Sequence, residues 1–209
     1  QQIAMAWLMY RLTDSALMLG LLGFAAQVPI LVFGPLGGVW SDRMDRRRLM
    51  MITQTLAMLQ ALLLAWLAWV GWATPVLLLT LAFLLGCVNA VDVPARQSLV
   101  VHLVGDRSQL PNAIALNSFM MNATRFVGPA LAGFIVAWAG ESVCFLLNAL
   151  SYLAVLLALL ALRARPQGDG SKPALHALRD GLRYTFGHAD IRLFLMLVAS
   201  VSFLIAPYV

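Results

Sequence analysis

The sequence has little charge for its length. Only 11% of its 209 residues are charged, whereas 62% are hydrophobic, and the mean hydropathy is +0.86. A soluble domain is about half apolar and about one quarter charged. This balance excludes an ordinary water-soluble domain, and we expect the lipid bilayer to be the solvent of this chain.

Motifs for catalysis, metal binding and nucleic-acid binding are also absent. The two cysteines, Cys87 and Cys144, lie singly in apolar runs, where we expect them to pack as small hydrophobic residues. There is no phosphate-binding glycine loop, nucleophile elbow or paired-histidine zinc motif. The net charge of +5 falls in clusters between apolar runs and not on one face. We therefore predict no enzyme activity, no metal or other cofactor, and no nucleic-acid partner.

The sequence does contain long apolar runs. A helix needs about 20 apolar residues to cross a bilayer, whereas barrel strands would alternate over about ten. The runs do not alternate, so we predict an all-α transmembrane protein. A first span, truncated, is expected to end near residue 12. The further predicted spans are residues 16–40, 49–70, 75–91, 112–138 and 143–162, with a seventh starting near 191.

The basic residues predict the orientation of these spans. Apart from Arg11 and Arg125, every lysine and arginine falls in one alternate set of loops. The other set holds Arg11 with Asp14 and Glu141. Because cytoplasmic loops carry an excess of positive charge, we expect the first set to be cytoplasmic.

The predicted spans divide the chain into three parts. Residues 1–162 form an N-terminal transmembrane bundle. Residues 163–190 are rich in glycine, proline and charge at first and then amphipathic, which indicates a cytoplasmic linker with a helix on the membrane surface. Residues 191–209 begin a second bundle. Two bundles joined by a long cytoplasmic linker are typical of secondary transporters.

A glycine-rich and arginine-rich stretch, GGVWSDRMDRRR at residues 37–48, lies between the second and third spans. Its glycines would let another helix approach closely, and Asp42, just past the helix end, could hold a cationic partner. The arginines sit where lipid headgroups and helix C-termini attract them. The alternative is cytoplasmic charge without a switching role.

In this position the stretch resembles the signature loop of the major facilitator superfamily, Gly-x-x-x-Asp-Arg-x-Gly-Arg-Arg/Lys. Asp45 stands where the family has a glycine, which puts the tightness of the turn in question. Residues 89–97, 112–118 and 125–133 are similar to a bacterial efflux branch that includes the enterobactin exporter. The resemblance implies the six-helix N-terminal bundle of a major facilitator fold plus the start of the seventh helix, with the C-terminal half of the same chain missing.

In that family the loop is taken to latch the cytoplasmic side of the transporter. The resemblance therefore implies a cytoplasmic gate formed by Gly38, Asp42, Arg43, Arg46, Arg47, Asp92 and Arg96. Asp92 and Arg96 are spaced for an i,i+4 ion pair. Asp92 could instead carry a proton.

Arg125 lies about 13 residues into the predicted fifth span, which corresponds to a rise of roughly 20 Å. A charge at that depth is costly unless it faces a watery cavity or a partner. We predict a substrate-cavity residue that binds anionic groups, with Asn89, Asn117 and Asn122 as weaker candidates. A structural role, such as bonding Asn122 or backbone carbonyls, is the alternative.

A glycine–proline pair follows Arg125 in the same span. Gly128, Pro129 and Gly133 resemble the Gly-Pro-x-x-Gly-Gly antiporter motif, with Ala132 in place of one glycine. Proline bends a helix and small residues allow close packing, so we expect a helix-packing motif here.

These features together predict a secondary exporter in a bacterial inner membrane. Its cargo would be a small amphipathic molecule, siderophore-like or drug-like, moved by alternating access with proton antiport. The alternative is a membrane-embedded lipid-handling protein or enzyme built on a helical bundle.

Overall fold

The computed structural model describes residues 1–103 and 107–161, and these belong to one compact unit, Gln1–Gly170. The predicted linker and the start of the seventh helix lie outside the described residues. The described chain is helical, so the predicted all-α transmembrane fold is confirmed.

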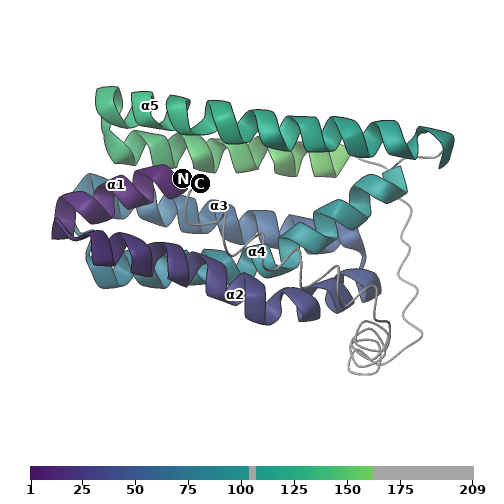
Figure 1. Ribbon diagram of the computed structural model, residues 1–209, viewed down its shortest axis with the longest axis horizontal. Coiled ribbons are helices and arrows are strands. Elements are labelled where there is room, and N and C mark those ends of the chain that lie inside the picture. The colour runs from purple at the N-terminus through teal and green to yellow at the C-terminus, as the bar shows by residue number, and fades with distance from the viewer. Residues whose placement is uncertain (104–106, 162–209) are drawn as a thin grey trace, which may run out of the picture. The chain divides into compact units, whose positions relative to one another are not determined.

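The first three helices are α1 (Gln2–Thr13), α2 (Ala16–Arg43) and α3 (Arg46–Val70), as Figure 1 shows. Asp14 closes α1 in the left-handed conformation with φ 47°, a geometry that aspartate tolerates better than most residues. The turn between α1 and α2 therefore falls where the sequence predicts it.

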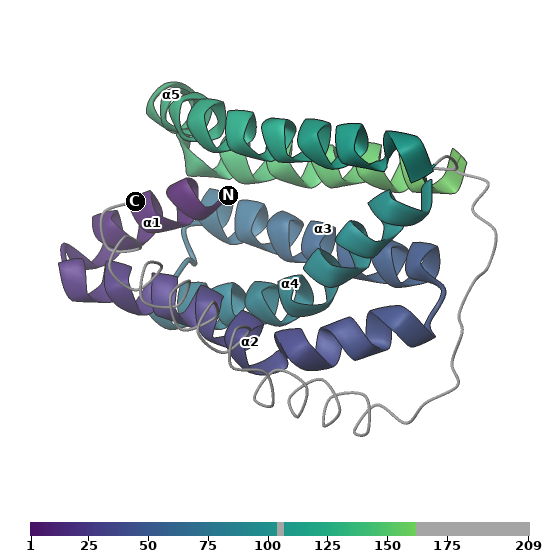
Figure 2. The same cartoon turned by 45° about the vertical axis from the view of Figure 1, so that its right-hand side comes forward.

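The fourth helix, α4 (Pro75–Leu103), is followed by a short 3-10 helix, η1 (Arg107–Gln109), and by α5 (Leu110–Ala161). Gly140 interrupts α5 with φ 83° and ψ 171°. Glycine has no Cβ and reaches this geometry without strain. Figures 1 and 2 both show the chain reversing there, so α5 is two helices lying side by side, as the predicted break between residues 138 and 143 requires.

Two predicted boundaries are wrong. The predicted fourth span stops at residue 91, but α4 continues through Pro94 to Leu103. The second helix also extends to Arg43, so Asp42 belongs to its last turn and not to a loop beyond it. Polar residues in the sequence suggested an end to each span, yet a helix keeps its own backbone hydrogen bonds whatever its side chains are.

Four helical stretches are long and apolar enough to cross a membrane, namely Ala16–Gly38, Arg46–Val70, Pro75–Leu99 and Leu110–Ala161. The chain is therefore a multi-pass membrane protein. By contrast α1 has 12 residues and a length of about 18 Å, shorter than the hydrocarbon layer of about 30 Å.

Two long-range contacts define opposite ends of the helices. At one end, Arg11 Nε of α1 lies 3.4 Å from Glu141 Oε1, directly after the Gly140 reversal. At the other end, Arg47 of α3 donates hydrogen bonds to carbonyl oxygens in the last turn of the described part of α5. Each pair joins segments that the arginine distribution places on one side of the membrane.

Helices α2 and α4 pack closely together, and glycines on both sides allow it. A Cβ atom on Gly37 of α2 would overlap the carbonyl oxygen of Ala90, and one on Gly86 of α4 would meet the carbonyl oxygen of Ala26. Ala90 is four residues before Pro94, which has no N–H to donate to it. Gly37 of α2 thus packs against a carbonyl oxygen of α4 that lacks the usual N–H donor four residues later in α4.

Buried side chains cluster at the two ends of these helices. The larger cluster is near the Arg11–Glu141 end and joins all five α-helices, with Phe145, Leu8 and Leu64 at 1% exposure or less. The smaller cluster is at the Arg47 end and includes Leu49, Ala95, Leu99 and Leu159. Cys144 is buried in the larger cluster, as the sequence predicts for a small hydrophobic residue.

Candidate functional site

Asp92 on α4 is the centre of a buried polar cluster. This residue is buried, with only 3% of its surface exposed. Thr53 Oγ1 donates to Asp92 Oδ1 at 2.7 Å, and Gln54 Nε2 donates to the same oxygen at 2.8 Å. Arg96 Nη2 lies 3.2 Å from Asp92 Oδ2, so the predicted i,i+4 ion pair is confirmed. The carboxylate is satisfied by donors from two helices, as a charge at membrane depth requires.

A cavity of about 270 Å3 opens beside this cluster, between α3, α4 and the second half of α5. Asp92, Arg96, Asn89 and Tyr152 contribute polar groups to its lining. The predicted cavity residue Asn89 therefore lies next to the predicted gate pair. A polar cavity that reaches a buried carboxylate can hold water or a proton donor within reach of that carboxylate.

The turn between α2 and α3 consists of Met44 and Asp45 alone. The Asp45 side chain caps α3 by accepting hydrogen bonds from the backbone N–H groups of Arg47 at 2.9 Å and Arg48 at 3.3 Å. Aspartate is among the preferred residues at a helix N-cap. Replacement of the usual glycine therefore leaves the turn tight.

The arginines of this stretch have different surroundings. Arg47 donates through Nε to the carbonyl oxygen of Leu159 at 2.7 Å and through Nη2 to that of Leu160 at 2.8 Å. The buried Nε of Arg46 has no hydrogen-bond partner among the described residues. A Cβ atom on Gly38 would meet nothing within 4 Å in the part of the chain that the structure describes. The side chains of Asp42 and Arg43 lie outside the described residues.

Arg125 lies in the middle of the first half of α5, fifteen residues from Leu110 and fifteen from Gly140, or about 22 Å from each. Its side chain is exposed, and within residues 1–103 and 107–161 no hydrogen bond or ion pair involves it. Asn122 donates to the Ser118 carbonyl oxygen, and Asn117 contacts the Met121 sulfur. Neither amide is bonded to Arg125.

The glycine–proline motif lies on the same helix half. Pro129 and Gly133 are exposed, and a Cβ atom on Gly133 would meet nothing within 4 Å in the described part of the chain. Close packing at this motif stays a prediction.

Several polar residues of this site were not predicted from the sequence as site residues. Thr53 and Gln54, which hold Asp92, belong to a helix about forty residues earlier in the chain. A second network joins α3, α4 and α5 through Gln1, the residue before α1: Asn148 donates to Gln1, Gln1 to Gln60, and Gln60 to the Leu81 carbonyl oxygen. The available signal was the presence of amides inside otherwise apolar spans, which is costly unless they are bonded or functional.

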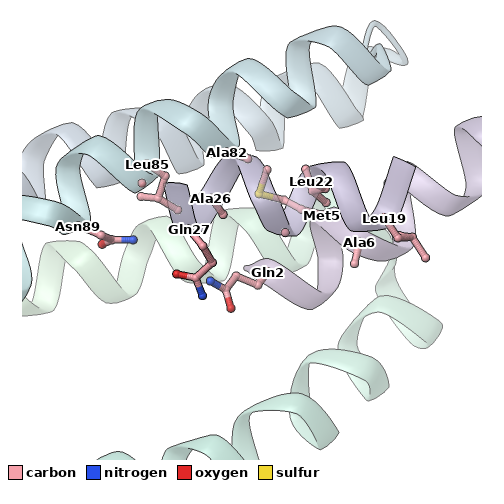
Figure 3. A pocket seen from close by; sticks show the side chains of 12 residues that line it. Gln2, Met5, Ala6, Leu19, Leu22, Ala26, Gln27, Ala82, Leu85 and Asn89 are labelled. Atoms are coloured by element: carbon pink, nitrogen blue, oxygen red, sulfur yellow. The ribbon is translucent and has the colours of Figure 1, made fainter. Parts of the chain in front are cut away.

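A second cavity, of about 200 Å3, lies between α1, α2 and α4. Figure 3 shows Gln2 and Gln27 side by side at its edge, with Asn89 farther along α4. The rest of the lining is apolar or glycine and includes Met5, Leu22 and other residues of these helices. The cavity therefore offers amide groups and no ionisable side chain.

Comparison with known proteins identifies relatives along nearly the whole chain. Residues 1–208 match the family described as transmembrane secretion effector, a group within the major facilitator superfamily. The staphyloferrin A transporter of Staphylococcus aureus is 34% identical over 160 residues, covering 76% of this chain and 40% of that protein. The multidrug efflux pump Tap of Mycobacterium tuberculosis is 26% identical over 220 residues, covering 98% of this chain and 51% of that protein.

A further relative is an uncharacterized transporter of the same superfamily from Sinorhizobium fredii, 34% identical over 130 residues, covering 61% of this chain and 31% of that protein. The chain thus spans about half or less of the length of these curated relatives. No solved structure matches the chain significantly.

Proposed function

This chain belongs to the transmembrane secretion effector family of the major facilitator superfamily, and from that premise we propose that it forms part of a secondary exporter of a small amphipathic molecule. Members of this family are transporters and not enzymes. The relatives whose names state a cargo are a staphyloferrin A transporter and multidrug efflux pumps. We propose a siderophore-like or drug-like cargo on that basis.

The single observation that carries this proposal is Arg125. It lies at the centre of a membrane-crossing helix, exposed, with no hydrogen bond or ion pair among the described residues. An unpaired guanidinium inside the hydrocarbon layer is strongly unfavourable, so such residues face a water-filled path or a partner. Substrate and coupling-ion sites of secondary transporters lie near this depth. Arg125 is our principal substrate-binding residue, with Asn89, Asn117 and Asn122 as weaker candidates.

We propose alternating access as the mechanism. The helices of residues 1–162 would form one rocking bundle, residues 163–190 the linker, and residues 191–209 the start of the opposing bundle. The cytoplasmic gate would consist of Gly38, Asp42, Arg43, Arg46, Arg47, Asp92 and Arg96. No described residue lies within 4 Å of a Cβ atom on Gly38, which supports a surface at which a moving neighbour could dock.

Proton antiport is the proposed energy source, across a bacterial inner membrane. Asp92 is the carboxylate best placed to exchange a proton, because it is buried beside a polar cavity. The packing motif Gly128, Pro129 and Gly133 would allow the first half of α5 to slide past the opposing bundle.

The test is Arg125→Ala in the transporter expressed from its whole gene. We expect at least a tenfold loss of proton-gradient-dependent uptake of lipophilic or siderophore-like compounds into inverted vesicles, with unchanged membrane insertion. Thr80→Val is the matched control, since Thr80 is exposed on α4 and bonds only to its own helix at Val76. Failure of the Arg125→Ala protein to insert into the membrane would indicate a structural role for Arg125. If vesicles with the unaltered protein showed no uptake that depends on the proton gradient, the exporter proposal would be overturned.

A further inference from the structure

Two groups of amide side chains in these helices differ in their bonding. Each member of the first group donates a hydrogen bond to a residue outside its own helix. Gln54 donates to Asp92, Gln60 donates to the Leu81 carbonyl oxygen, and Asn148 donates to Gln1. These amides satisfy one another or another buried group, as the low dielectric of a bilayer demands.

The second group is Gln2, Gln27 and Asn89. No hydrogen bond joins any of them to another side chain or to the backbone in the described part of the chain. All three line the cavity between α1, α2 and α4 (Figure 3). An unbonded amide inside a membrane costs free energy, so these residues are available to a ligand or to water in a way that Gln60 is not.

The unbonded amides share a depth with Arg125. Gln27 lies about 16 Å along α2 from Ala16, and Asn89 lies about 21 Å along α4 from Pro75. Arg125 lies about 22 Å from the Gly140 reversal. These three starting points are at the same end of the helices, so Gln27, Asn89 and Arg125 form a polar layer of similar depth near the middle of the membrane.

Among the described residues, the positive charge of Arg125 in this layer has no compensating carboxylate. The carboxylate of Asp92 is already held by Arg96 and by two neutral donors, and Glu141 is paired with Arg11. Arg125 has no such partner among the described residues. A cationic ligand in this layer would be repelled by Arg125, whereas an anion would be attracted in a medium that screens charge weakly.

We propose that this half of the transporter selects small anionic compounds rich in carbonyl and hydroxyl oxygens. Arg125 would bind the negative charge through its fork of N–H donors, and Gln2 and Gln27 would bond the neutral oxygens. Gln2 and Gln27 are then specificity-determining residues. This inference rests on the proposed exporter function and adds the class of its substrate.

The first test compares an anionic and a cationic dye. Inverted vesicles containing the transporter from its whole gene are energised with a proton gradient, and uptake of carboxyfluorescein and of ethidium is measured. We expect gradient-dependent uptake of carboxyfluorescein only, reduced at least tenfold by Arg125→Gln and restored in part by Arg125→Lys.

The outcomes separate this inference from the exporter proposal. Uptake of ethidium without carboxyfluorescein overturns the anion class but leaves the exporter standing. Carboxyfluorescein uptake that Arg125→Gln does not change overturns the role of Arg125 in selection. If neither dye is taken up, the exporter proposal is contradicted, and so is the substrate class that depends on it.

The second test uses a matched pair of amides. Gln27→Leu is expected to raise the KM for carboxyfluorescein about 3- to 10-fold, the loss of one neutral hydrogen bond, while leaving the midpoint of thermal unfolding unchanged or higher. Gln60→Leu is expected to lower that midpoint, because the Leu81 carbonyl oxygen and Gln1 lose their partner. A lowered unfolding midpoint for Gln27→Leu with an unchanged KM would make Gln27 a structural residue and overturn its assignment.

Discussion

At the scale of single residues, Asp45 is the departure from the signature loop that the structure explains. The sequence shows only that an acidic side chain replaces a glycine. The structure shows that this side chain accepts hydrogen bonds from two N–H groups at the start of α3. A glycine would leave those donors to solvent, so the substitution strengthens the turn.

We expect Asp45→Ala to destabilise the protein by about 1 kcal/mol, because the capping acceptor is lost. Asp45→Asn keeps an acceptor and should be nearly neutral, and Asp45→Gly should cost only about 0.3 kcal/mol. The measurement is the free energy of unfolding in mixed micelles. Equal stability of the alanine and asparagine variants would show that the cap contributes nothing.

At the scale of helices, the pairing of α2 with α4 explains two features that the sequence presents separately. Pro94 leaves the Ala90 carbonyl oxygen without its helical donor, and Gly37 of α2 packs against that oxygen. Close contact of a glycine Cα with a carbonyl is a weak but recurring stabilising interaction between helices. Helix α4 continues past this proline to Leu103, so the contact lies within the helix and not at its end.

The glycines of α2 supply a matched pair for testing this contact. Gly37→Ala should destabilise the protein by roughly 1–3 kcal/mol, because its methyl group must displace the Ala90 backbone. Gly34→Ala places a methyl group in open space and should be neutral or stabilising by up to about 1 kcal/mol, since alanine favours helix. Unfolding in mixed micelles measures both changes, and identical values would contradict close packing at Gly37.

At the scale of the whole molecule, the contacts agree with one membrane topology. The Arg11–Glu141 pair ties α1 to the Gly140 reversal at one end. The bonds from Arg47 to the Leu159 and Leu160 carbonyl oxygens tie α3 to α5 at the other. Because positive charge gathers at the Arg47 end, that end is expected to face the cytoplasm.

Cysteine labelling tests this orientation. Cys87 and Cys144 are first replaced by alanine, and a single cysteine is introduced as Met44→Cys or Trp72→Cys, at exposed positions in turns at opposite ends. A membrane-impermeant maleimide should label Trp72→Cys in intact cells and Met44→Cys only after lysis. Leu84→Cys, exposed within a span, is the unreactive control. Labelling of Met44→Cys in intact cells would invert the topology.

The sequence alone was sufficient for the all-α membrane fold, the breaks between residues 12 and 16 and between residues 138 and 143, and the Asp92–Arg96 pair. Each of these depends on local properties, namely the length of an apolar run and an i,i+4 spacing. The ends of α2 and α4 were not predictable in this way, because polar side chains in the last turns of a membrane helix do not end it.

Only the tertiary structure could identify the partners across helices. Thr53 and Gln54 meet Asp92 because α3 packs beside α4, and Arg47 reaches the end of α5 across more than a hundred residues of chain. Nothing in an amide's own sequence context tells a bonded Gln60 from an unbonded Gln27. The difference depends on which neighbouring helix supplies a donor or acceptor, and helix packing alone determines that.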